Sequence, residues 1–435
     1  MNKFSQTSIA PRGIRFRMSR GALLVTCLLT AVAAQAGEDD YPVFARVQET
    51  LTRDSNFSRT DKEQAETIST TSAIIGLNKD YGRQNYSLNG MASRNHYAHY
   101  GDTLNNTSSN LTGGFKTDIL RNWRFTLGGE YQQNLNPIQN NSLQQRVTKN
   151  IRTYRDQNAS LKYGLDGDWT ITAAFDQNRQ AYSVPSYRSV DANQSSRSLG
   201  VNYNVTDKMY YEIAFRGVST RYPETPTKRI QYDNNIDLSA NWMESAQSNF
   251  DARLSPRVTT YSDDSSRKIR GWYGSLNWNF APRGIWTYNT SISKNSGADR
   301  RQGQLLDTTA TSSTDLVTSS TSFRFGATAA VTGKTSLSYS YQLTKNRFNL
   351  ANEYGNLTSG IQGYLLQTYG YYVVPDKAVV PTVTHISQLS LTYVPMRSVT
   401  TQCDLQFYSQ TRDQNGVRFS GRSLGCFASF TINPL

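Results

Sequence analysis

The sequence lacks long apolar runs and is poor in the residues that usually build active sites. It has 435 residues with only three cysteines and three histidines, and its mean hydropathy is −0.60. No apolar run approaches about 18 residues, which excludes a membrane protein made of helices. There is no Gly-x-Ser-x-Gly elbow, zinc-ligand spacing or phosphate-binding loop. We therefore expect no enzymatic activity, no cofactor and no metal ion.

What the sequence does contain is a regular series of short turns, spaced about 40 residues apart with one longer polar loop between consecutive turns. Strands that cross a bilayer up and down need tight turns on one side and carry free loops on the other, so this alternation is typical of a transmembrane barrel. The expected short turns lie at 79–83, 120–122, 166–168, 206–208, 243–247, 281–284, 332–334 and 395–397.

The segments between turns alternate apolar and polar residues. In the segment 123–131, Trp123, Phe125 and Leu127 share one face, and Arg124 and Glu130 share the other. Such a period of two gives a strand with one face for lipid and one for water. A soluble β-sandwich would alternate in the same way, so alternation alone leaves that alternative open.

Tryptophan placement favours the barrel over the sandwich. Five of the six tryptophans, Trp123, Trp169, Trp242, Trp278 and Trp286, lie close to an expected short turn. Indole rings collect at membrane interfaces, where the ring reaches hydrocarbon and the N–H reaches water. We predict that these five side chains form one ring at the periplasmic interface.

The fold prediction is an all-β, transmembrane, up-and-down antiparallel β-barrel of about 18 strands, formed by residues 37–435. Barrels of this size enclose an aqueous channel. The expected strands are 43–53, 68–78, 84–97, 108–119, 123–135, 151–165, 169–182, 198–205, 210–221, 234–242, 249–261, 268–280, 285–295, 321–331, 335–347, 385–394, 398–408 and 417–432.

Residues 1–36 are predicted to be a cleaved secretory signal peptide. A basic segment ending at Arg20 precedes an apolar segment over 22–34, and the small-residue motif Ala34-Gln35-Ala36 provides a cleavage site. A secreted β-barrel is expected in the outer membrane of a Gram-negative bacterium, with outer-membrane lipid as a partner.

The strand alternation also predicts which side chains line the lumen. Amides, hydroxyls and charges of both signs dominate this face, and no ring of a single charge sign suggests an ion filter. The wall suits hydrated, hydroxyl-rich solutes, or it is simply a wetted surface. The net charge of +13 is spread without clustering, so we expect no nucleic-acid partner. The expected pore-lining residues are Arg124, Glu130, Asp156, Asn158, Asp176, Arg216, Asp237, Asp251, Arg253 and Asp404.

Two features near the end of the chain carry further predictions. With a turn at 413–416, Cys403 lies opposite Cys426 on the same strand face, which predicts a disulfide in an oxidising compartment. A register shifted by two residues would instead leave two lipid-facing thiols.

The long segment 348–382 is unusually rich in tyrosine and apolar residues, and it either gates the outer mouth or extends its hairpin above the membrane.

A family resemblance adds to this interpretation. An Asp-x-Asn-Φ element at Asp54, Asn56 and Phe57, where Φ is apolar, precedes a strand, a Tyr-x-Arg-Gln turn at 81–84 and a strand that ends with Arg94 and Tyr97. This stretch resembles the EpsL-type exopolysaccharide-associated outer-membrane proteins, which are grouped with β-barrel porins. The similarity runs through most of the mature chain and fades after about residue 300. It implies a barrel that works with an exopolysaccharide synthesis and export system, and it implies no catalytic residues.

The function hypothesis is therefore a passive aqueous route for an exported polysaccharide, with periplasmic export components as expected partners. A general diffusion porin for small solutes is the first alternative, and a surface barrel that anchors exported polysaccharide is the second. A hydrolase with a His and a Ser at the outer rim is the last, because His96 and His99 are expected to be exposed loop residues and serine is abundant.

Overall fold

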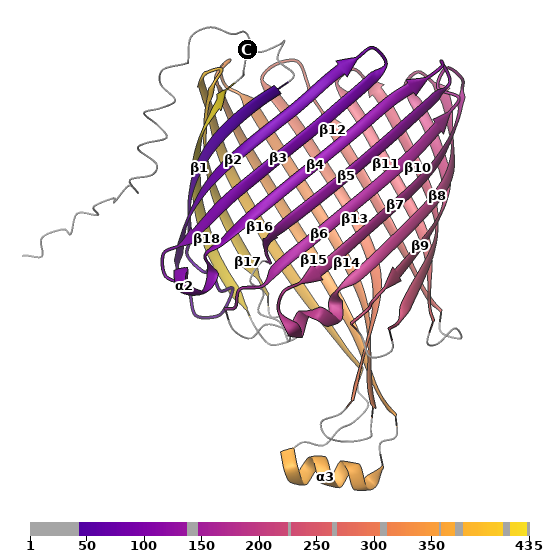
Figure 1. Cartoon of the computed structure of the whole chain (residues 1–435), viewed down its shortest axis with the longest axis vertical. Helices are drawn as coiled ribbons and strands as arrows, with labels where there is room; N and C mark the ends of the chain where they lie inside the picture. The colour runs from indigo at the N-terminus through magenta and orange to yellow at the C-terminus, as the bar shows by residue number, and fades with distance from the viewer. Residues whose placement is uncertain are drawn as a thin grey trace, which may run out of the picture. The chain divides into compact units, whose positions relative to one another are not determined.

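Eighteen antiparallel strands, each paired with its neighbours in sequence, close into one barrel in the computed structural model (Figure 1). The first strand, β1 (Val43–Asp54), pairs with the last, β18 (Phe419–Ile432), from Ala45 opposite Ile432 to Asp54 opposite Ser423. Closure leaves no free sheet edge, so the strands can satisfy their backbone hydrogen bonds inside hydrocarbon. The predicted fold class is confirmed.

The structure describes residues 43–136, 147–224, 228–262, 268–304, 311–355, 358–369, 377–411 and 418–432. All of them belong to one compact unit, residues 42–434. The predicted signal peptide lies outside the described residues. In the described ranges, no helix is long and apolar enough to cross a membrane.

The remaining strands follow one another around the barrel in chain order. They are β2 (Glu66–Tyr81), β3 (Gln84–Tyr97), β4 (Asn106–Ile119), β5 (Trp123–Leu135), β6 (Ile151–Tyr163), β7 (Trp169–Tyr182), β8 (Ala192–Thr206), β9 (Met209–Arg221), β10 (Ile230–Ser245), β11 (Ser248–Tyr261), β12 (Ile269–Phe280), β13 (Trp286–Gln304), β14 (Thr311–Ala330), β15 (Thr335–Gly355), β16 (Lys377–Met396) and β17 (Val399–Gln410). Three short helices lie in the longer connections: α2 (Gly101–Leu104), η1 (Pro185–Val190) and α3 (Ser359–Tyr369).

Short turns and longer connections alternate along the chain, as the sequence predicts. The strand β2 ends at Tyr81 and β3 begins at Gln84, so only Gly82 and Arg83 lie between them. Gly82 has a φ of 62°, a left-handed conformation that glycine adopts without strain in two-residue hairpin turns. At the other ends of the strands, the connection between β15 and β16 spans residues 356–376 and includes α3.

Six strands are at least seven residues longer than predicted: β8 and β10, expected over 198–205 and 234–242, and β13 to β16. The expected strands 285–295, 321–331, 335–347 and 385–394 correspond to β13, β14, β15 and β16, whose pairing continues to Gln304 opposite Thr311 and to Ala351 opposite Lys377. The extension 311–320 is mostly Ser and Thr, so hydropathy gives no signal for it, whereas the extensions 348–355 and 377–384 contain apolar residues within the segment predicted as a long loop. Backbone pairing with an equally long neighbour holds them in the sheet.

Exposure alternates cleanly along single strands and identifies the two faces of the wall. On β10, Tyr232, Ile236 and Leu238 are each at least 40% exposed, whereas Asp233 and Asp237 between them are only 7% exposed. Side chains on the concave face of a closed sheet crowd together, so the exposed apolar set is the outer face and the polar set is the inner face. An apolar outer face with a polar interior places this closed barrel in the outer membrane of a Gram-negative bacterium.

Aromatic rings stack along the outer face beside the short turns. The series crosses four strands from β10 to β13, with centroid distances of 5.5 Å between Trp242 and Phe250, 6.0 Å between Phe250 and Trp278, 5.5 Å between Trp278 and Phe280, and 6.2 Å between Phe280 and Tyr288. Interfacial anchoring of the barrel follows from this arrangement. Two further stacked pairs are Trp169 with Tyr203 and Trp286 with Tyr288, and Trp123 forms a tilted pair with Tyr163.

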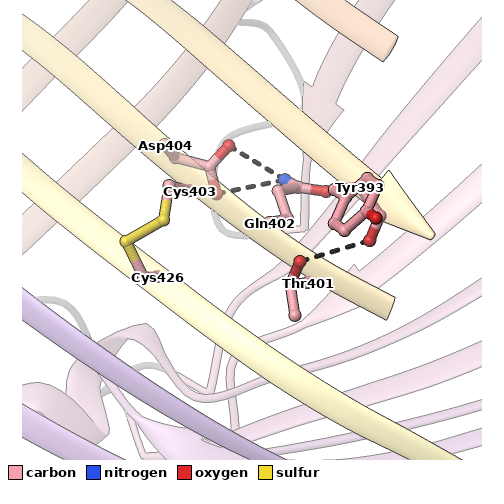
Figure 2. Close-up of a disulfide and its surroundings, with 6 residues drawn as sticks. All are labelled: Tyr393, Thr401, Gln402, Cys403, Asp404 and Cys426. Carbon is pink, nitrogen blue, oxygen red and sulfur yellow. Dashed lines mark hydrogen bonds between the residues drawn. A yellow bond between two sulfur atoms is a disulfide. The ribbon is translucent and has the colours of Figure 1, made fainter. Parts of the chain in front are cut away.

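A disulfide joins Cys403 and Cys426 across β17 and β18, where the register places the two residues directly opposite each other (Figure 2). The residues beside Cys403 have the opposite orientation: the Gln402 amide donates a hydrogen bond of 2.9 Å to Asp404 on the inner face. The register shifted by two residues, which would separate the cysteines, is not the one adopted.

We predict that the disulfide stabilises the barrel. In the chain-entropy model, closing a loop of 23 residues contributes about 3 kcal/mol. The double variant Cys403→Ser/Cys426→Ser should lose up to about this amount of free energy of unfolding, measured by urea titration in detergent. Thiol labelling of the unfolded, unreduced mature wild type should modify no cysteine. Labelling of two cysteines would show that the bond does not form.

Candidate functional site

The inner face of the barrel is the candidate site, because it encloses the only route that the architecture itself provides. Eighteen strands spaced about 4.8 Å apart and tilted by about 40° give a backbone diameter of about 36 Å. Side chains cannot fill an interior of that width, so an aqueous lumen remains. Along each strand, every second side chain points into the lumen, and these side chains determine its chemistry.

The strand registers place all ten predicted pore-lining residues on the inner face. Each alternates with outward apolar or small residues of its own strand, as Arg216 does with the exposed Ile213 and Phe215. They come from seven of the eighteen strands: Arg124 and Glu130 on β5, Asp156 and Asn158 on β6, Asp176 on β7, Arg216 on β9, Asp237 on β10, Asp251 and Arg253 on β11, and Asp404 on β17. The ten residues therefore do not converge on one point.

Three of these residues form the most tightly linked charge cluster of the wall. Arg216 on β9 donates two hydrogen bonds to Asp237 on β10, of 2.7 Å and 3.0 Å. Arg253 on β11 approaches the same carboxylate to 3.2 Å. The Asp237 side chain is only 10% exposed, whereas the two arginines are 32% and 42% exposed. Two guanidinium groups on one carboxylate leave the cluster with an excess of one positive charge.

Three carboxylates gather on the neighbouring sector formed by β5, β6 and β7. Glu130 lies directly opposite Asp156, and Asn158 lies directly opposite Asp176. Asn158 donates a hydrogen bond to Asp156 at 3.2 Å, and Asn178 donates one to Asp176 at 3.5 Å, while Asp156 and Asp176 also interact directly. This sector is therefore acidic, and amide groups donate hydrogen bonds to two of its three carboxylates.

Asp404 and Asp251 are held by amides in the same way. Gln402 and Gln388 donate to Asp404 at 2.9 Å and 3.3 Å, and Asn277 donates to Asp251 at 3.3 Å. Near the short-turn side, Arg124 forms a two-pronged pair with Asp118, with distances of 2.7 Å and 2.9 Å. The wall thus combines internally paired charges with amides and hydroxyls that remain open to solvent.

The described residues of the inner face offer hydrogen-bonding groups and charges. Within the described ranges, no group of three His, Cys, Asp or Glu residues could hold a metal ion. At the outer rim, His385 lies opposite Ser409 in the ladder, but its Nδ1 shares a hydrogen bond of 2.9 Å with the Tyr341 hydroxyl. No described hydrogen bond joins His385 to a serine, which gives the rim-hydrolase alternative no support.

A network across the barrel seam was not anticipated from the sequence. Asp54, at the end of β1, accepts hydrogen bonds from Arg59 at 2.9 Å and 3.0 Å and from the Tyr408 hydroxyl of β17. The Asn56 amide donates to the Ser420 carbonyl of β18 at 3.0 Å. We call Asp54, Asn56, Arg59 and Tyr408 the seam network. Its only sequence signal is the Asp-x-Asn element, because its partners lie more than 340 positions away.

Other residues in the stretch that carries the family resemblance form contacts around the first long connections. The Phe57 ring packs at 5.6 Å from Tyr97. Glu66 is completely buried and accepts hydrogen bonds from the backbone N–H groups of Ala98 at 2.9 Å and Tyr100 at 3.0 Å. His99 lies 3.5 Å from the same carboxylate with its own side chain 70% exposed. These contacts order the first long connections, and they do not indicate which solute the barrel transports.

The long segment 348–382 is partly strand. Residues 348–355 continue β15, residues 377–382 belong to β16, and Phe348 pairs with Val380 in the ladder. The helix α3 lies between these strands in the chain. Of the two alternatives, the hairpin does extend beyond its expected length, while a gating role stays a prediction.

Comparisons with known proteins give no family for this chain. No family model and no curated protein matches the chain. Similar solved structures include the outer membrane protein OpdK of Pseudomonas aeruginosa, with a TM-score of 0.47 and 8% identity over 91% of this chain and 100% of that chain. OccAB3 of Acinetobacter baumannii has a TM-score of 0.46 and 10% identity over 91% and 100%. The FrpB iron transporter of Neisseria meningitidis has a TM-score of 0.47 and 8% identity over 91% and 82%.

We predict that Asp237 stabilises the wall by neutralising its two arginines. Replacing Asp237 by Ala leaves Arg216 and Arg253 facing each other without a counter-charge, and should lower the free energy of unfolding by about 2–4 kcal/mol. Asp251→Ala is the matched control, because Asp251 has an amide partner and no ion pair among the described residues, and it should cost less than about 1 kcal/mol. Equal losses for both variants in urea titrations would contradict the role of the cluster.

Proposed function

We propose that the protein is a passive, water-filled channel of the outer membrane whose cargo is a hydroxyl-rich carbohydrate, in the first place an exported polysaccharide. The observation that carries the proposal is the inner wall, whose charges are largely paired with each other or with amides. A solute in this lumen therefore meets mainly amide and hydroxyl groups. Carbohydrate cargo is further supported by the resemblance to exopolysaccharide-associated barrels.

The wall chemistry suits sugars because each sugar hydroxyl both donates and accepts hydrogen bonds. Asn and Gln side chains have the same dual capacity, and Ser and Thr hydroxyls share it. Tyrosines add flat apolar surfaces next to polar groups: Tyr154 and Tyr273 lie on inward positions, each with an arginine over its ring at 5.5 Å and 5.8 Å. A neutral polymer can exchange one wall contact for the next without releasing a tightly bound charge.

A general diffusion porin for small solutes is the second candidate, and the cluster of Arg216, Asp237 and Arg253 favours it. The excess positive charge of this cluster would act on small anions that pass close to the wall. The two candidates differ in the size and charge of the solute that the channel accepts. They therefore make different predictions in a reconstituted system.

We predict that the purified barrel conducts ions in planar bilayers and that neutral oligosaccharides enter it and reduce its conductance reversibly. Arg216→Gln/Arg253→Gln should move the selectivity toward cations and leave the oligosaccharide effect unchanged. A barrel without conductance would overturn the channel itself. Conductance that neutral oligosaccharides never reduce, with normal surface polysaccharide in a deletion strain, would favour the small-solute porin.

We predict that removal of residues 355–376 widens access to the lumen if this segment covers the outer mouth. The deletion keeps most of the paired parts of β15 and β16, so the barrel should assemble and show the heat-dependent migration of the wild type. Its single-channel conductance should rise, and its oligosaccharide on-rate should increase. Unchanged conductance in an assembled barrel would show that the segment only extends its hairpin.

A further inference from the structure

Four exposed arginines stand on the outer wall of four adjacent strands. Arg155 on β6, Arg179 on β7, Arg197 on β8 and Arg221 on β9 all take outward positions and are exposed. The register places Arg155 directly opposite Arg179 and Asn193 directly opposite both Arg179 and Arg221, whereas Arg197 lies four positions from Asn193, opposite Phe175. We call these four residues the outer arginine patch. Its residues face the surroundings of the barrel, so it is separate from the lumen.

Arg155, Arg179 and Arg221 lie at the membrane interface on the side of the long connections, and Arg197 lies four positions closer to the short turns. On β7 the outward residues run from Trp169 beside a short turn through Ile171 and Phe175 to Arg179. Ten positions at about 3.3 Å each, on a strand tilted by about 40°, put Arg179 about 25 Å above Trp169 along the barrel axis. The apolar band of such barrels is about 25 Å tall, so Arg179 is at the opposite interface, where the outer leaflet begins.

No carboxylate of the described residues forms an ion pair with any of the four arginines. Arg155 and Arg179 are like charges on directly opposed positions, an arrangement that destabilises a sheet unless an anion lies between them. Arg155 instead has its guanidinium over the Tyr131 ring at 5.7 Å. Asp191, in the connection after β7, attracts Arg179 from a distance, but its carboxylate accepts a hydrogen bond from the Tyr182 N–H at 2.9 Å.

Arginines on the inner and outer faces of the wall differ in whether they have carboxylate partners. Inward arginines such as Arg124 and Arg216 have aspartate partners within 3 Å. Outward arginines of the patch have none among the described residues, although the chain has 33 acidic residues. Arginine matches phosphate with two parallel hydrogen bonds and remains charged at a hydrocarbon boundary. The missing counter-charge is therefore expected to come from the membrane.

We propose that Arg155, Arg179, Arg197 and Arg221 bind the phosphate groups of a phosphorylated glycolipid in the outer leaflet. Exposed apolar residues on the short-turn side of Arg179, among them Phe175 opposite Arg197 and Leu199, lie where the acyl chains of the same lipid would pack. A lipid fits this combination of charge and apolar surface, whereas a free anion uses only the charge. The glycolipid would relieve the repulsion between Arg155 and Arg179 and fix the barrel at one depth.

The test compares binding of lipid A, enzymatically dephosphorylated lipid A and inorganic phosphate to the purified full-length mature barrel in detergent. Native mass spectrometry counts the bound lipid, and competition gives its affinity. The variant Arg155→Gln/Arg179→Gln/Arg197→Gln/Arg221→Gln should bind lipid A at least about tenfold more weakly than the wild type. The matched control Arg121→Gln/Lys208→Gln/Arg283→Gln/Arg397→Gln removes the same charge from the short turns and should bind like the wild type.

A charge-conserving variant with lysine at the four patch positions separates electrostatics from assembly. It should retain most of the lipid A binding, and heat-dependent migration reports whether each barrel is folded. If the glutamine variant does not fold, the wild type still decides: it should prefer lipid A over the dephosphorylated form and should not lose lipid A to equimolar inorganic phosphate. Equal binding of the two lipids, displacement by inorganic phosphate, or unchanged binding by the folded glutamine variant would overturn the proposal.

Discussion

The need to satisfy every backbone hydrogen bond in hydrocarbon determines the rest of this structure. A sheet in a membrane can have no open edge, so β18 must return to β1, and the ladder between Ala45 and Asp54 on one side and 423–432 on the other completes the ring. Closure puts one face of every strand against lipid and the other against the lumen. The period of two in the sequence, the apolar outer band and the polar inner wall all follow from that single requirement.

Local signals were sufficient to predict the barrel, since its turns and alternating strands are properties of short segments. The register of the last hairpin is also local, which is why the position of Cys403 opposite Cys426 follows from the turn alone. The extended parts of β13 to β16 are different. Segments such as 311–320 are polar on both faces, and only the pairing of two long neighbours reveals them as strands.

The candidate site shows the same division between local and distant information. Strand alternation was enough to place Arg216, Asp237 and Arg253 on the inner face, but it could not show that they converge on one carboxylate. That convergence depends on the relative register of β9, β10 and β11. The seam network could not be predicted either, because Asp54 and Tyr408 become neighbours only when the barrel closes.

Acidic and basic side chains are distributed differently between the two faces of the sheet. Carboxylates are concentrated on the inner face, where water and amides solvate them, and several arginines are directed outward at the outer interface. An acidic side chain that faced the anionic surface of an outer leaflet would be repelled by it, whereas a basic side chain would be attracted. Glu49, which faces outward on β1, is hydrogen-bonded by Ser69 at 2.7 Å and by Thr71 of the neighbouring strand.

The seam network has a consequence for the order of folding events. Contacts between Asp54 and Tyr408 close a loop of 354 positions, and the entropic cost of closing a loop grows with its length. A hairpin such as β17–β18 joins strands that are adjacent in the chain, so the entropic cost of closing it is far lower. The disulfide between Cys403 and Cys426 can therefore form before the ring is complete. The contacts that Asp54, Asn56 and Arg59 make with Tyr408 and Ser420 therefore arise only when the ring closes. They stabilise the ladder between β1 and β18, whose strands are not consecutive in the chain, and contacts that form after the folding transition state slow unfolding.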